Sequence, residues 1–570
     1  MKKFEVAWAF SEMADLLEIQ GAEAYKVRAY RKAAQTLANL SRDLEQMAAE
    51  DRLEEIPGVG KALAAKIKEI LSTGTLRHLE ELREKIPPDL VRLLEIPGVG
   101  PRTAALVYRQ LNIRTLAELE DAARAQKLRY LPGVGAKKEQ QILHGIEILK
   151  NRGGRSLLGT ALPWAREFLR LLRSHPGVGG AEVAGSVRRR QETVGDLDLV
   201  VSSTEPERVV DFFLRLPPVR QELERGQSGA SALAAAGLRV DLQVVPPCEF
   251  VARLHRATGS REHLARLEQL AAEKGLQLAG EGFVDGKGQP RAFPGEEALY
   301  RELGLSYIPP ELRENRGEIE AASRGELPAL VTRGDIRGDL HTHTTWSDGI
   351  SGLEEMVSAA RALGYEYLAI TDHSRSLAVA RGLDEERLAA QKARIEELNQ
   401  ELEDIRLLSG VEVDILPDGR LDIRDEVLAG LDVVVASIHS GFRQDPQVLT
   451  SRLEGAIKNE HVDIVAHPTG RLLGRREPYG VDLDRILDLA REMNTALEIN
   501  ASPDRLDLND RQARRARERG VTVAINTDAH STAGLEDMEY GVSVARRGWL
   551  EPGDILNCLP LKDLLRRLRR

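Results

Sequence analysis

Two carboxylates separated by one residue, Asp196 and Asp198, lie in an apolar stretch of the chain. In a strand, residues two apart share a face, so both carboxylates point to one side while their leucine neighbours enter the core. Adjacent carboxylates repel unless cations join them, and hard oxygen ligands suit Mg²⁺ or Mn²⁺ bridging phosphates. Asp241, in another alternating strand, would complete a two-metal site for phosphoryl transfer.

A phosphate-binding element precedes these carboxylates. Gly185 and Ser186 are followed by three arginines, Arg188 to Arg190, so the segment offers backbone, hydroxyl and guanidinium donors for a triphosphate. An Asp-x-Asp pair by itself is most often a solvated strand face. Its combination with this donor cluster favours a nucleotide site.

Histidines concentrate in the last third of the chain, where six of the 12 occur in short motifs interleaved with three carboxylates. All but Asp348, which lies in the loop after the first strand, end or directly follow an apolar strand. The nine candidates are His341, His343, Asp348, His373, Glu412, His439, His467, Asp528 and His530. Mixed imidazole and carboxylate ligands suit Zn²⁺, Mn²⁺ or Fe. Clustered metals of this kind catalyse phosphoester hydrolysis.

A glycine turn occurs three times in the first 150 residues, as Ile-Pro-Gly-Val-Gly twice and then as Leu-Pro-Gly-Val-Gly. A turn of this type leaves backbone N–H groups free at the start of the next helix, where they can hold a phosphate without reading a base. One copy is more often a plain turn, but three copies with Lys or Arg nearby favour DNA-backbone binding. They resemble helix-hairpin-helix motifs. The glycines concerned are Gly58, Gly60, Gly98, Gly100, Gly133 and Gly135.

The elements that must position these residues change along the chain. Residues 1–150 have a helical pattern throughout. Residues 155–247 read as α+β, with apolar alternation at 183–187, 197–201 and 238–245. From Gly338 onward, about seven short apolar strands alternate with helices, which predicts a barrel with functional residues at the carboxyl ends of its strands.

Composition limits the classes of protein. The 570 residues are 42% hydrophobic and 30% charged, the range of globular proteins, and suggest several domains. Net charge is −10, yet residues 1–150 hold 24 Lys and Arg against 22 Asp and Glu, so DNA binding by this region is not excluded. Two cysteines rule out a disulfide scaffold. With no apolar run long enough for a membrane and no signal-peptide pattern, we expect a cytoplasmic protein.

Residues 1 to about 315 resemble a family X DNA polymerase, the group that includes polymerase beta. The resemblance implies that Asp196 and Asp198 bind two Mg²⁺ or Mn²⁺ ions and that Asp241 activates the primer 3′-hydroxyl. It further implies nucleotide contacts at Gly185, Ser186, Arg189, Gly195, Thr258 and Gly259.

The amino-terminal part is also similar to the lyase domain of polymerase beta. The match rests on Ala29-Tyr-Arg-Lys-Ala-Ala34, the first glycine turn and Lys66. In the family, the lysine at this position can form a Schiff base with an abasic sugar, and Lys26 nearby would lower the pKa of that amine. The alternative, that Lys66 only contacts phosphate, is equally open.

The nucleotide pocket departs from the family pattern. Arg256 and Ala257 stand where family members carry a Tyr-Phe-like pair, Leu264 replaces an Asn, and Glu268 replaces an Arg. We therefore expect a slow polymerase with weak discrimination between deoxyribose and ribose.

The C-terminal motif order resembles the PHP domain, named for polymerases and histidinol phosphatase. The resemblance implies about three Zn²⁺ or Mn²⁺ ions. It would place His341, His343, Glu412 and Asp528 on the first ion, Glu412, His439 and His467 on the second, and Asp348, His373 and His530 on the third. Arg471 and Arg475, just after His467, are candidate phosphate clamps.

The predicted fold is therefore multidomain: all-α hairpin region, α+β palm and thumb, and an α/β distorted TIM-like (β/α)7 barrel. We expect a lyase-like domain at 1–85, fingers at 86–154, a palm at 155–247, a thumb at 248–315, a linker at 316–337 and a PHP domain at 338–570.

The combined resemblance implies a monomeric polymerase that fills short gaps in base excision repair, with a metal-dependent 3′–5′ exonuclease or phosphoesterase. Its substrates would be deoxynucleoside triphosphates and gapped or nicked double-stranded DNA, bound without sequence preference. Two alternatives stay open: a DNA-targeted PHP nuclease or phosphatase with an attenuated polymerase site, and a non-catalytic end-binding scaffold.

Overall fold

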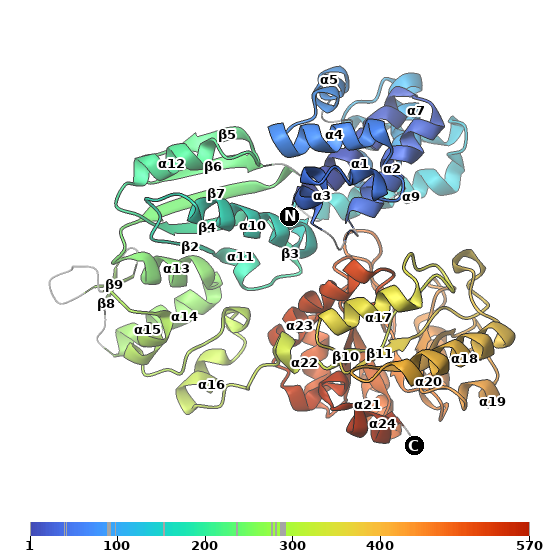
Figure 1. Cartoon of the computed structure of the whole chain (residues 1–570). Coiled ribbons are helices and arrows are strands. Elements are labelled where there is room, and N and C mark those ends of the chain that lie inside the picture. The colour runs from blue at the N-terminus through green and yellow to red at the C-terminus, as the bar shows by residue number, and fades with distance from the viewer. Residues whose placement is uncertain are drawn as a thin grey trace. The chain divides into compact units, whose positions relative to one another are not determined.

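The computed structural model describes residues 2–38, 40, 43–87, 90, 93–96, 98–151, 154–234, 237–274, 277–279, 282–284 and 292–568 (Figure 1). Pro97 of the second glycine turn lies outside these residues. The chain divides into two compact units, Met1–Gly154 with Gly474–Arg476, and Arg155–Leu473 with Glu477–Arg570. Among the described residues, no helix is both long and apolar enough to cross a membrane.

The first unit is helical, as the sequence predicts. Its core includes Phe10, Leu37, Ile67 and Ile142, all fully buried. The α-helices are α1 (Lys2–Gln20), α2 (Ala24–Ala38), α3 (Leu44–Ala49), α4 (Lys61–Thr73), α5 (Arg77–Lys85), α7 (Pro101–Leu111), α8 (Leu116–Arg124) and α9 (Gly135–Asn151).

The glycine turns open three of these helices. The first glycine of each turn, Gly58, Gly98 or Gly133, has a φ of +86°, +92° or +75°, a conformation that only glycine adopts without strain. Helix α4 or α7 begins one residue after the last glycine of the turn, whereas α9 begins at that glycine. The first backbone N–H groups of these helices have no intrahelical acceptor and are available for a phosphate.

A five-stranded sheet of order β2-β4-β7-β6-β5, here called the palm sheet, begins the second unit. Strands β4 and β7 are parallel neighbours, and their register sets Asp198 beside Asp241. The strands are β2 (Gly180–Val183), β4 (Leu197–Ser202), β5 (Val219–Arg225), β6 (Gly229–Ala234) and β7 (Arg239–Val245). The short strands β1 (Ser156–Leu157) and β3 (Thr193–Val194) pair with each other in a separate two-stranded antiparallel sheet. The helices of this region are α10 (Leu158–Arg173), α11 (Gly185–Arg188) and α12 (Pro206–Leu214).

One predicted strand in this region is wrong. The apolar alternation at 183–187 covers the last residue of β2 and then helix α11. Gly185 has a φ of +56°, which turns the chain out of the strand and into the helix. Arg189, just after this helix, lies close enough to the carboxylates that its charge lowers the pKa of Asp198.

A helical segment follows the palm sheet. It contains α13 (Phe250–Thr258), α14 (Arg261–Glu273), β8 (Gln277–Ala279), β9 (Gly282–Val284) and α15 (Glu296–Glu302). Residues 316–337, predicted as a linker, hold helix α16 (Glu318–Arg324). Ile319, Ala321 and Ala322 of this helix are buried in the same core as Tyr300 and Leu312, because their small apolar side chains fill it.

The C-terminal third is the predicted barrel. Seven parallel strands run in chain order: β10 (Gly338–Asp339), β11 (Tyr367–Ile370), β12 (Arg406–Asp414), β13 (Val433–Ser437), β14 (Ile464–Val465), β15 (Ala496–Asn500) and β16 (Val523–Asn526). A parallel bridge between Thr342 and Ala529, just after the first and last strands, nearly closes the barrel. The helices are α17 (Leu353–Ala362), α18 (Glu385–Glu401), α19 (Asp425–Leu428), α20 (Pro446–Ile457), α21 (Leu483–Met493), α22 (Asp510–Glu518), α23 (Met538–Arg547) and α24 (Leu561–Leu568).

Candidate active sites

The three predicted carboxylates meet on the palm sheet. Asp196 directly precedes β4, Asp198 lies in β4, and Asp241 lies beside it in β7. One oxygen from each lies within 4.8 Å of an oxygen of the others. A cleft of about 1130 Å³ opens over Asp198 and Asp241 and has Ser231 and Arg239 in its lining. The geometry suits cations held between the carboxylates and a phosphate in the cleft.

Electrostatic repulsion marks this cluster. Burial, followed by the charges of Asp196 and Asp241, raises the pKa of Asp198 to about 7. Burial and Asp241 also raise the pKa of Asp196. Divalent cations would relieve the repulsion and favour the ionised carboxylates, so the electrostatics fit a metal site.

The structure shows two hydrogen-bond partners of Asp241 that the sequence analysis did not predict. The Ser231 hydroxyl donates a hydrogen bond to Asp241 from the neighbouring strand β6, and Arg239 Nε lies 3.0 Å from both carboxylate oxygens. Arg239 and Asp241 are two residues apart on one strand, and this shared face is the signal that identifies Arg239. Together the two partners fix the orientation of the carboxylate.

The predicted nucleotide-binding residues divide into two groups. Gly185 and Ser186 begin α11, Arg189 directly follows that helix, and Gly195 directly precedes Asp196. The positive charge of Arg189 lowers the pKa of Asp198. Thr258 is instead fully buried, and its hydroxyl donates to the Leu254 carbonyl and accepts from Arg188. The hydroxyl of Thr258 is thus occupied inside the protein, because α13 packs over α11, and Gly259 follows it at the end of α13.

The departures from the family pattern are linked. Arg256 Nη1 and Glu268 Oε1 lie 3.0 Å apart, so the two substituted charges pair with each other. Both side chains are exposed enough that this ion pair contributes little to stability. The pair leaves each of the two charges neutralised by the other.

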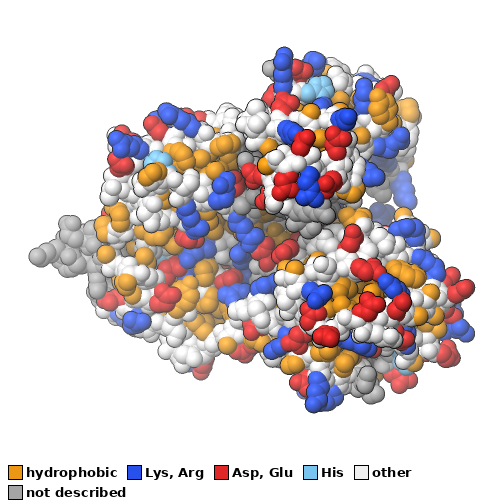
Figure 2. All heavy atoms as spheres, viewed as in Figure 1, with side chains coloured by type: hydrophobic (Ala, Val, Ile, Leu, Met, Phe, Trp, Pro, Cys, Tyr) orange, Lys and Arg blue, Asp and Glu red, His pale blue; other side chains and the backbone are white. Residues whose placement is uncertain are grey.

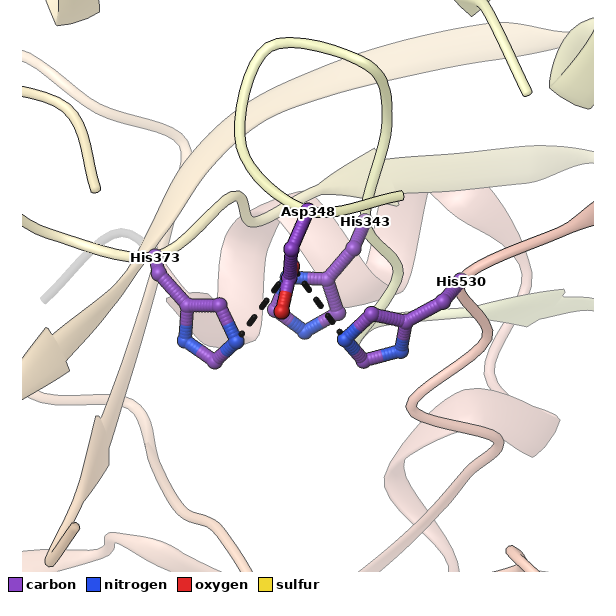
Figure 3. Close-up of side chains that lie close together, drawn as sticks. All are labelled: His343, Asp348, His373 and His530. Carbon is purple, nitrogen blue, oxygen red and sulfur yellow. Dashed lines mark ion pairs between the residues drawn. The ribbon is translucent and has the colours of Figure 1, made fainter. Parts of the chain in front are cut away.

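The nine predicted metal ligands also converge. Each lies at or just beyond the carboxyl end of a barrel strand, except Asp348, which a loop returns to the same end. Three groups have ligand atoms within 4.8 Å of one another: His343, Asp348, His373 and His530; His341, His343 and Glu412; and His373, Glu412 and His439. Figure 3 shows the first group, with Asp348 between His373 and His530 at 3.6 and 3.3 Å.

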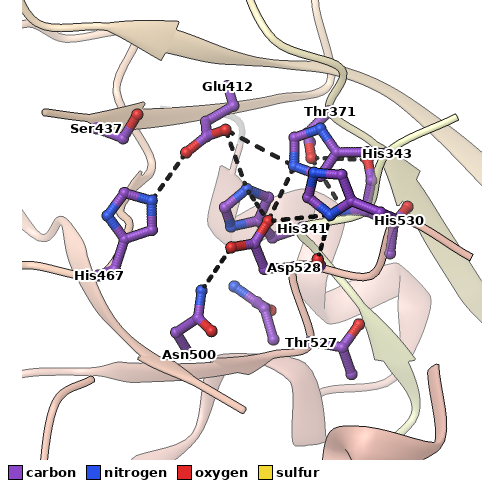
Figure 4. Close-up of polar contacts among 12 residues, drawn as sticks. His341, His343, Thr371, Glu412, Ser437, His467, Asn500, Thr527, Asp528 and His530 are labelled. Atoms are coloured by element: carbon purple, nitrogen blue, oxygen red, sulfur yellow. Dashed lines mark hydrogen bonds and ion pairs between the residues drawn. The ribbon is translucent and has the colours of Figure 1, made fainter. Parts of the chain in front are cut away.

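The remaining two candidates complete the cluster. His467 Nε2 lies 3.0 Å from Glu412 Oε1, and Asp528 Oδ1 lies 3.1 Å from His343 Nε2 (Figure 4). His343 and His373 each belong to two groups, so the boundaries between the three implied metal sites are less sharp than the predicted partition.

Several ligand atoms fit metal coordination. Within the described part of the chain, His343 Nδ1 is buried and has no hydrogen-bond partner. His341 Nε2, His343 Nε2 and Glu412 Oε2 are also buried without a well-aligned hydrogen bond, and their neighbours are the charged groups of the other predicted ligands. Unpaired buried polar atoms are costly unless a ligand or ion satisfies them. The donor set of imidazoles and carboxylates is the one that Zn²⁺ or Mn²⁺ prefers.

The charges of the cluster agree with this assignment. Burial disfavours a charged imidazole, but Glu412 and Asp414 raise the pKa of His439 to about 9, and Asp348 and Asp528 do the same for His530. Burial, His530 and His373 instead lower the pKa of His343 to about 3. Protons on imidazoles therefore balance the buried carboxylates, and bound cations would replace those protons.

The sequence analysis did not predict the carboxylates that support the metal-ligand candidates. Glu498, fully buried in β15, accepts a hydrogen bond from His341 Nδ1 at 2.8 Å and one from the His467 backbone N–H. Asp414 accepts from the backbone N–H of His439, and Asp372 accepts from Ser347, next to Asp348. The signal for Glu498 is its place between Leu497 and Ile499, in the middle of a buried strand. Such partners fix the orientation of metal-binding histidines.

Arg471, one of the two predicted phosphate clamps, has partners within the protein. Arg471 is buried, and its guanidinium pairs with Glu192 at 2.7 Å and donates to the Leu506 carbonyl. Arg475 belongs to Gly474–Arg476, which groups with residues 1–154. Arg505 lies at the metal cluster instead, because its Nε is 3.6 Å from Asp528 Oδ2 and its charge contributes to the lowered pKa of buried His467. Its buried Nη1 has no hydrogen-bond partner among the described residues.

In the first unit, Lys66 contacts Tyr30. The Lys66 amine donates a hydrogen bond to the Tyr30 hydroxyl and lies 5.0 Å from the centre of the ring. Lys26 pairs with Glu23 at 3.6 Å. Tyr30 is therefore a further partner for the predicted lyase residue. It belongs to the Ala29–Ala34 motif on which the resemblance rests.

Comparisons with known proteins agree with this architecture. Four family models match the chain: a helix-hairpin-helix domain at 1–76, a SAM-like helix-hairpin-helix tandem at 90–147, a DNA polymerase beta thumb at 253–314 and a PHP domain at 339–502. The DNA polymerase/3′-5′ exonuclease PolX of Bacillus subtilis (strain 168) is 41% identical over 573 residues, which cover 100% of both chains.

Two other relatives match only part of the chain. A protein of Thermoanaerobacter sp. (strain X514), named a probable phosphatase, is 29% identical over 230 residues, 38% of this chain and 89% of the relative. A protein of Shewanella sp. (strain MR-4) with the same kind of name is 26% identical over 233 residues, 39% of this chain and 88% of the relative.

The hairpins, the polymerase thumb and the PHP barrel define a DNA-binding enzyme that uses divalent metal ions. The chain belongs to the PolX family, the family X DNA polymerases with a C-terminal PHP domain.

Proposed function

We propose that the protein is a template-directed DNA polymerase that fills short gaps, and that its PHP barrel is a 3′–5′ exonuclease or phosphoesterase acting on the same DNA. The observation that carries the proposal is the presence of two separate metal-ligand clusters in one chain, on the palm sheet and in the barrel. The named activities of the PolX relative support the pairing. Trimming and refilling of 3′ ends would serve base excision repair.

In the palm, the carboxylates of Asp196 and Asp198 would hold two Mg²⁺ or Mn²⁺ ions, which neutralise charge on the transferred phosphoryl group. Asp241, oriented by Ser231 and Arg239, would take the proton of the primer 3′-hydroxyl. Ser186 and Arg189, with the backbone of Gly185 and Gly195, would bind the phosphates of a deoxynucleoside triphosphate. Gly259, beyond the end of α13, would contact the same nucleotide.

In the barrel, the nine clustered side chains would hold about three Zn²⁺ or Mn²⁺ ions, which activate water and polarise a phosphoester. Glu498 would keep His341 oriented as a ligand. Arg505 would bind a non-bridging phosphate oxygen, the role that the sequence analysis gave to Arg471 and Arg475. Its short reach to the Asp528 carboxylate supports this assignment.

DNA would be held through its backbone by the three glycine turns, which offer helix N-termini and no base-reading groups. Acidic and basic side chains are interleaved on the face shown in Figure 2, which agrees with backbone binding at a few converging points rather than over a broad basic surface. We propose that one copy of the chain acts alone on gapped or nicked DNA.

A primer-extension assay on a one-nucleotide gap in Mn²⁺, with and without deoxynucleotides, tests the proposal. Asp241→Asn should abolish gap filling and retain shortening of the primer. His341→Ala should abolish shortening and retain gap filling. Shortening without filling by the parent protein would favour a nuclease with an attenuated polymerase site. Absence of both activities, together with no bound transition metal, would leave an end-binding scaffold.

A lyase activity is a second candidate, favoured by the contact between Lys66 and Tyr30. The Lys66 amine would attack the aldehyde carbon of an abasic sugar and release water as the imine forms. Borohydride would then trap the protein on an abasic DNA. Trapping should disappear in Lys66→Ala, and its survival there would assign Lys66 to phosphate binding.

The ion pair of Arg256 with Glu268 carries the expectation of weak sugar discrimination, because it occupies the surface where the family places aromatic side chains. Single-nucleotide kinetics with matched deoxy- and ribonucleotides measure this directly. A strong preference for deoxynucleotides would overturn it.

A further inference from the structure

Arg547 is the last residue of helix α23 in the barrel, and its side chain contacts residues of the polymerase part of the same unit. Its side chain is 5% exposed. Nη1 donates to the Arg189 backbone carbonyl at 2.8 Å and lies 3.2 Å from Glu314 Oε1, while Nη2 donates to Asp510 at 2.8 Å. A buried arginine whose donors are divided among three acceptors has a fixed position.

The residue that it contacts, Arg189, is the proposed phosphate-binding arginine beside the palm carboxylates. Arg189 Nε donates to Glu314 at 2.9 Å, and Nη1 donates to the Thr258 carbonyl at 2.7 Å. These two bonds fix the plane of the guanidinium. Glu314 therefore holds the side chain of Arg189, and Arg547 contacts both Glu314 and the backbone of Arg189.

The charges along this line alternate. Glu314 receives donors from Arg189, Gln191 and Arg547. Asp510 in turn receives Arg547 and Arg316, each at 2.8 Å. Each carboxylate therefore lies between two arginines, and removal of Arg547 would leave Glu314 and Asp510 each with one cation fewer.

We propose that Arg547 of the PHP barrel is a positioning residue for nucleotide binding by the polymerase, acting through Glu314 on Arg189. The inference rests on the proposed binding of triphosphate by Arg189. Without Arg547, the Arg189 carbonyl would lose a hydrogen-bond donor, and Glu314 would lose the second of its two cations. The Arg189 side chain would then take up a wider range of positions. Triphosphate binding would weaken, while the three carboxylates that carry the chemistry would keep their contacts.

The preceding residue, Arg546, is a matched control. It lies at the same end of α23, and its side chain also contacts residues that precede the barrel. Arg546 Nε donates to Glu311 at 2.7 Å, and Nη1 donates to the Val331 carbonyl at 3.0 Å. Among the described residues, neither of these partners belongs to the line of charges from Arg189 to Arg316. A general weakening of the contacts between the barrel and the preceding segment would appear in both variants, whereas loss of positioning would appear only in Arg547.

The test uses the full chain and single-nucleotide gap filling at varied deoxynucleotide concentration. Arg547→Met should raise KM for the nucleotide on the order of 10-fold, the size expected for one lost charge-assisted hydrogen bond, with kcat little changed. Arg547→Lys should recover part of that loss. Arg546→Met should leave KM near the parent value. Exonuclease activity without nucleotides should persist in all three variants and report an intact barrel.

Arg189→Met separates this inference from the proposal beneath it. If Arg189→Met leaves KM unchanged, the proposed nucleotide role of Arg189 fails. If Arg189→Met raises KM and Arg547→Met does not, only the positioning role of Arg547 fails. Equal increases in Arg546→Met and Arg547→Met, or a fall in kcat instead of a rise in KM, would also overturn the positioning role.

Discussion

The Asp198 carboxylate lies directly against the backbone of Gly185: a Cβ at Gly185 would stand 1.9 Å from Asp198 Oδ2. Gly185 also has a φ of +56°. The proposed phosphate-binding element can approach Asp198, a proposed catalytic carboxylate, only because position 185 has no side chain.

Gly185→Ala should therefore lower nucleotidyl transfer by about 10-fold or more, since displacement of a positioned group by about 1 Å is enough for such losses. The exonuclease of the barrel should be unchanged. Gap filling and primer shortening, measured on the same preparation, check both statements. Gly179→Ala is the control, because a Cβ there would meet only ordinary contacts at 3.6 and 3.7 Å.

Glu498 sets the orientation of His341 without being a predicted ligand itself. Glu498→Gln should lower metal content or exonuclease activity by about 10- to 100-fold, the usual effect of losing such a partner. Elemental analysis of the purified variant, beside its exonuclease rate, measures this. Polymerase activity should stay at the parent level, and a fall of both activities would point to misfolding instead.

Arg505 and Arg471 should differ in what they contribute. Arg505→Met should raise KM for DNA 3′ ends in the exonuclease reaction, on the order of 10-fold for a lost charge-assisted contact, with little change in melting temperature. Arg471→Met should instead lower the melting temperature, because it leaves Glu192 and the Leu506 carbonyl without their buried donor. A reversed pattern would return the phosphate role to Arg471.

Asp537 makes stability depend on pH. Burial, followed by the charges of Glu539 and Asp504, raises its pKa from 3.8 to about 7. The native state thus holds the proton more tightly than the unfolded state, so this group's contribution to stability falls as pH rises from about 4 to 7. At pH 8, Asp537→Asn should raise the melting temperature by a few degrees, since each kcal/mol of added stability corresponds to about 2–4 °C. Near pH 4 the substitution should have little effect on the melting temperature.

Thermal unfolding at both pH values provides the measurement. An equal effect of Asp537→Asn at pH 8 and near pH 4 would show that the carboxylate is not the cause. Asp335→Asn is a suitable comparison, since the Asp335 carboxylate caps the turn at Arg333–Asp335 by accepting hydrogen bonds from the Thr332 backbone N–H and hydroxyl, and its replacement should not stabilise the protein.

Much of this protein follows from its sequence. The Asp-x-Asp spacing places two carboxylates on one strand face by periodicity alone. Eight of the nine predicted metal ligands mark strand ends, because parallel strands share one carboxyl edge. The three glycine turns likewise predict helix starts, since the positive φ of their first glycine is a local property.

Other features depended on the tertiary structure. The register of β4 against β7 placed Asp198 beside Asp241, and a turn at Gly185 replaced the strand that alternation predicted. The division of arginines between phosphate and protein partners could not be read from the chain. Nothing in the local sequence of Arg471 or Arg505 predicts its partner. Only folding decided that Arg471 pairs with Glu192, far away in the chain, and that Arg505 pairs with Asp528 at the end of another strand.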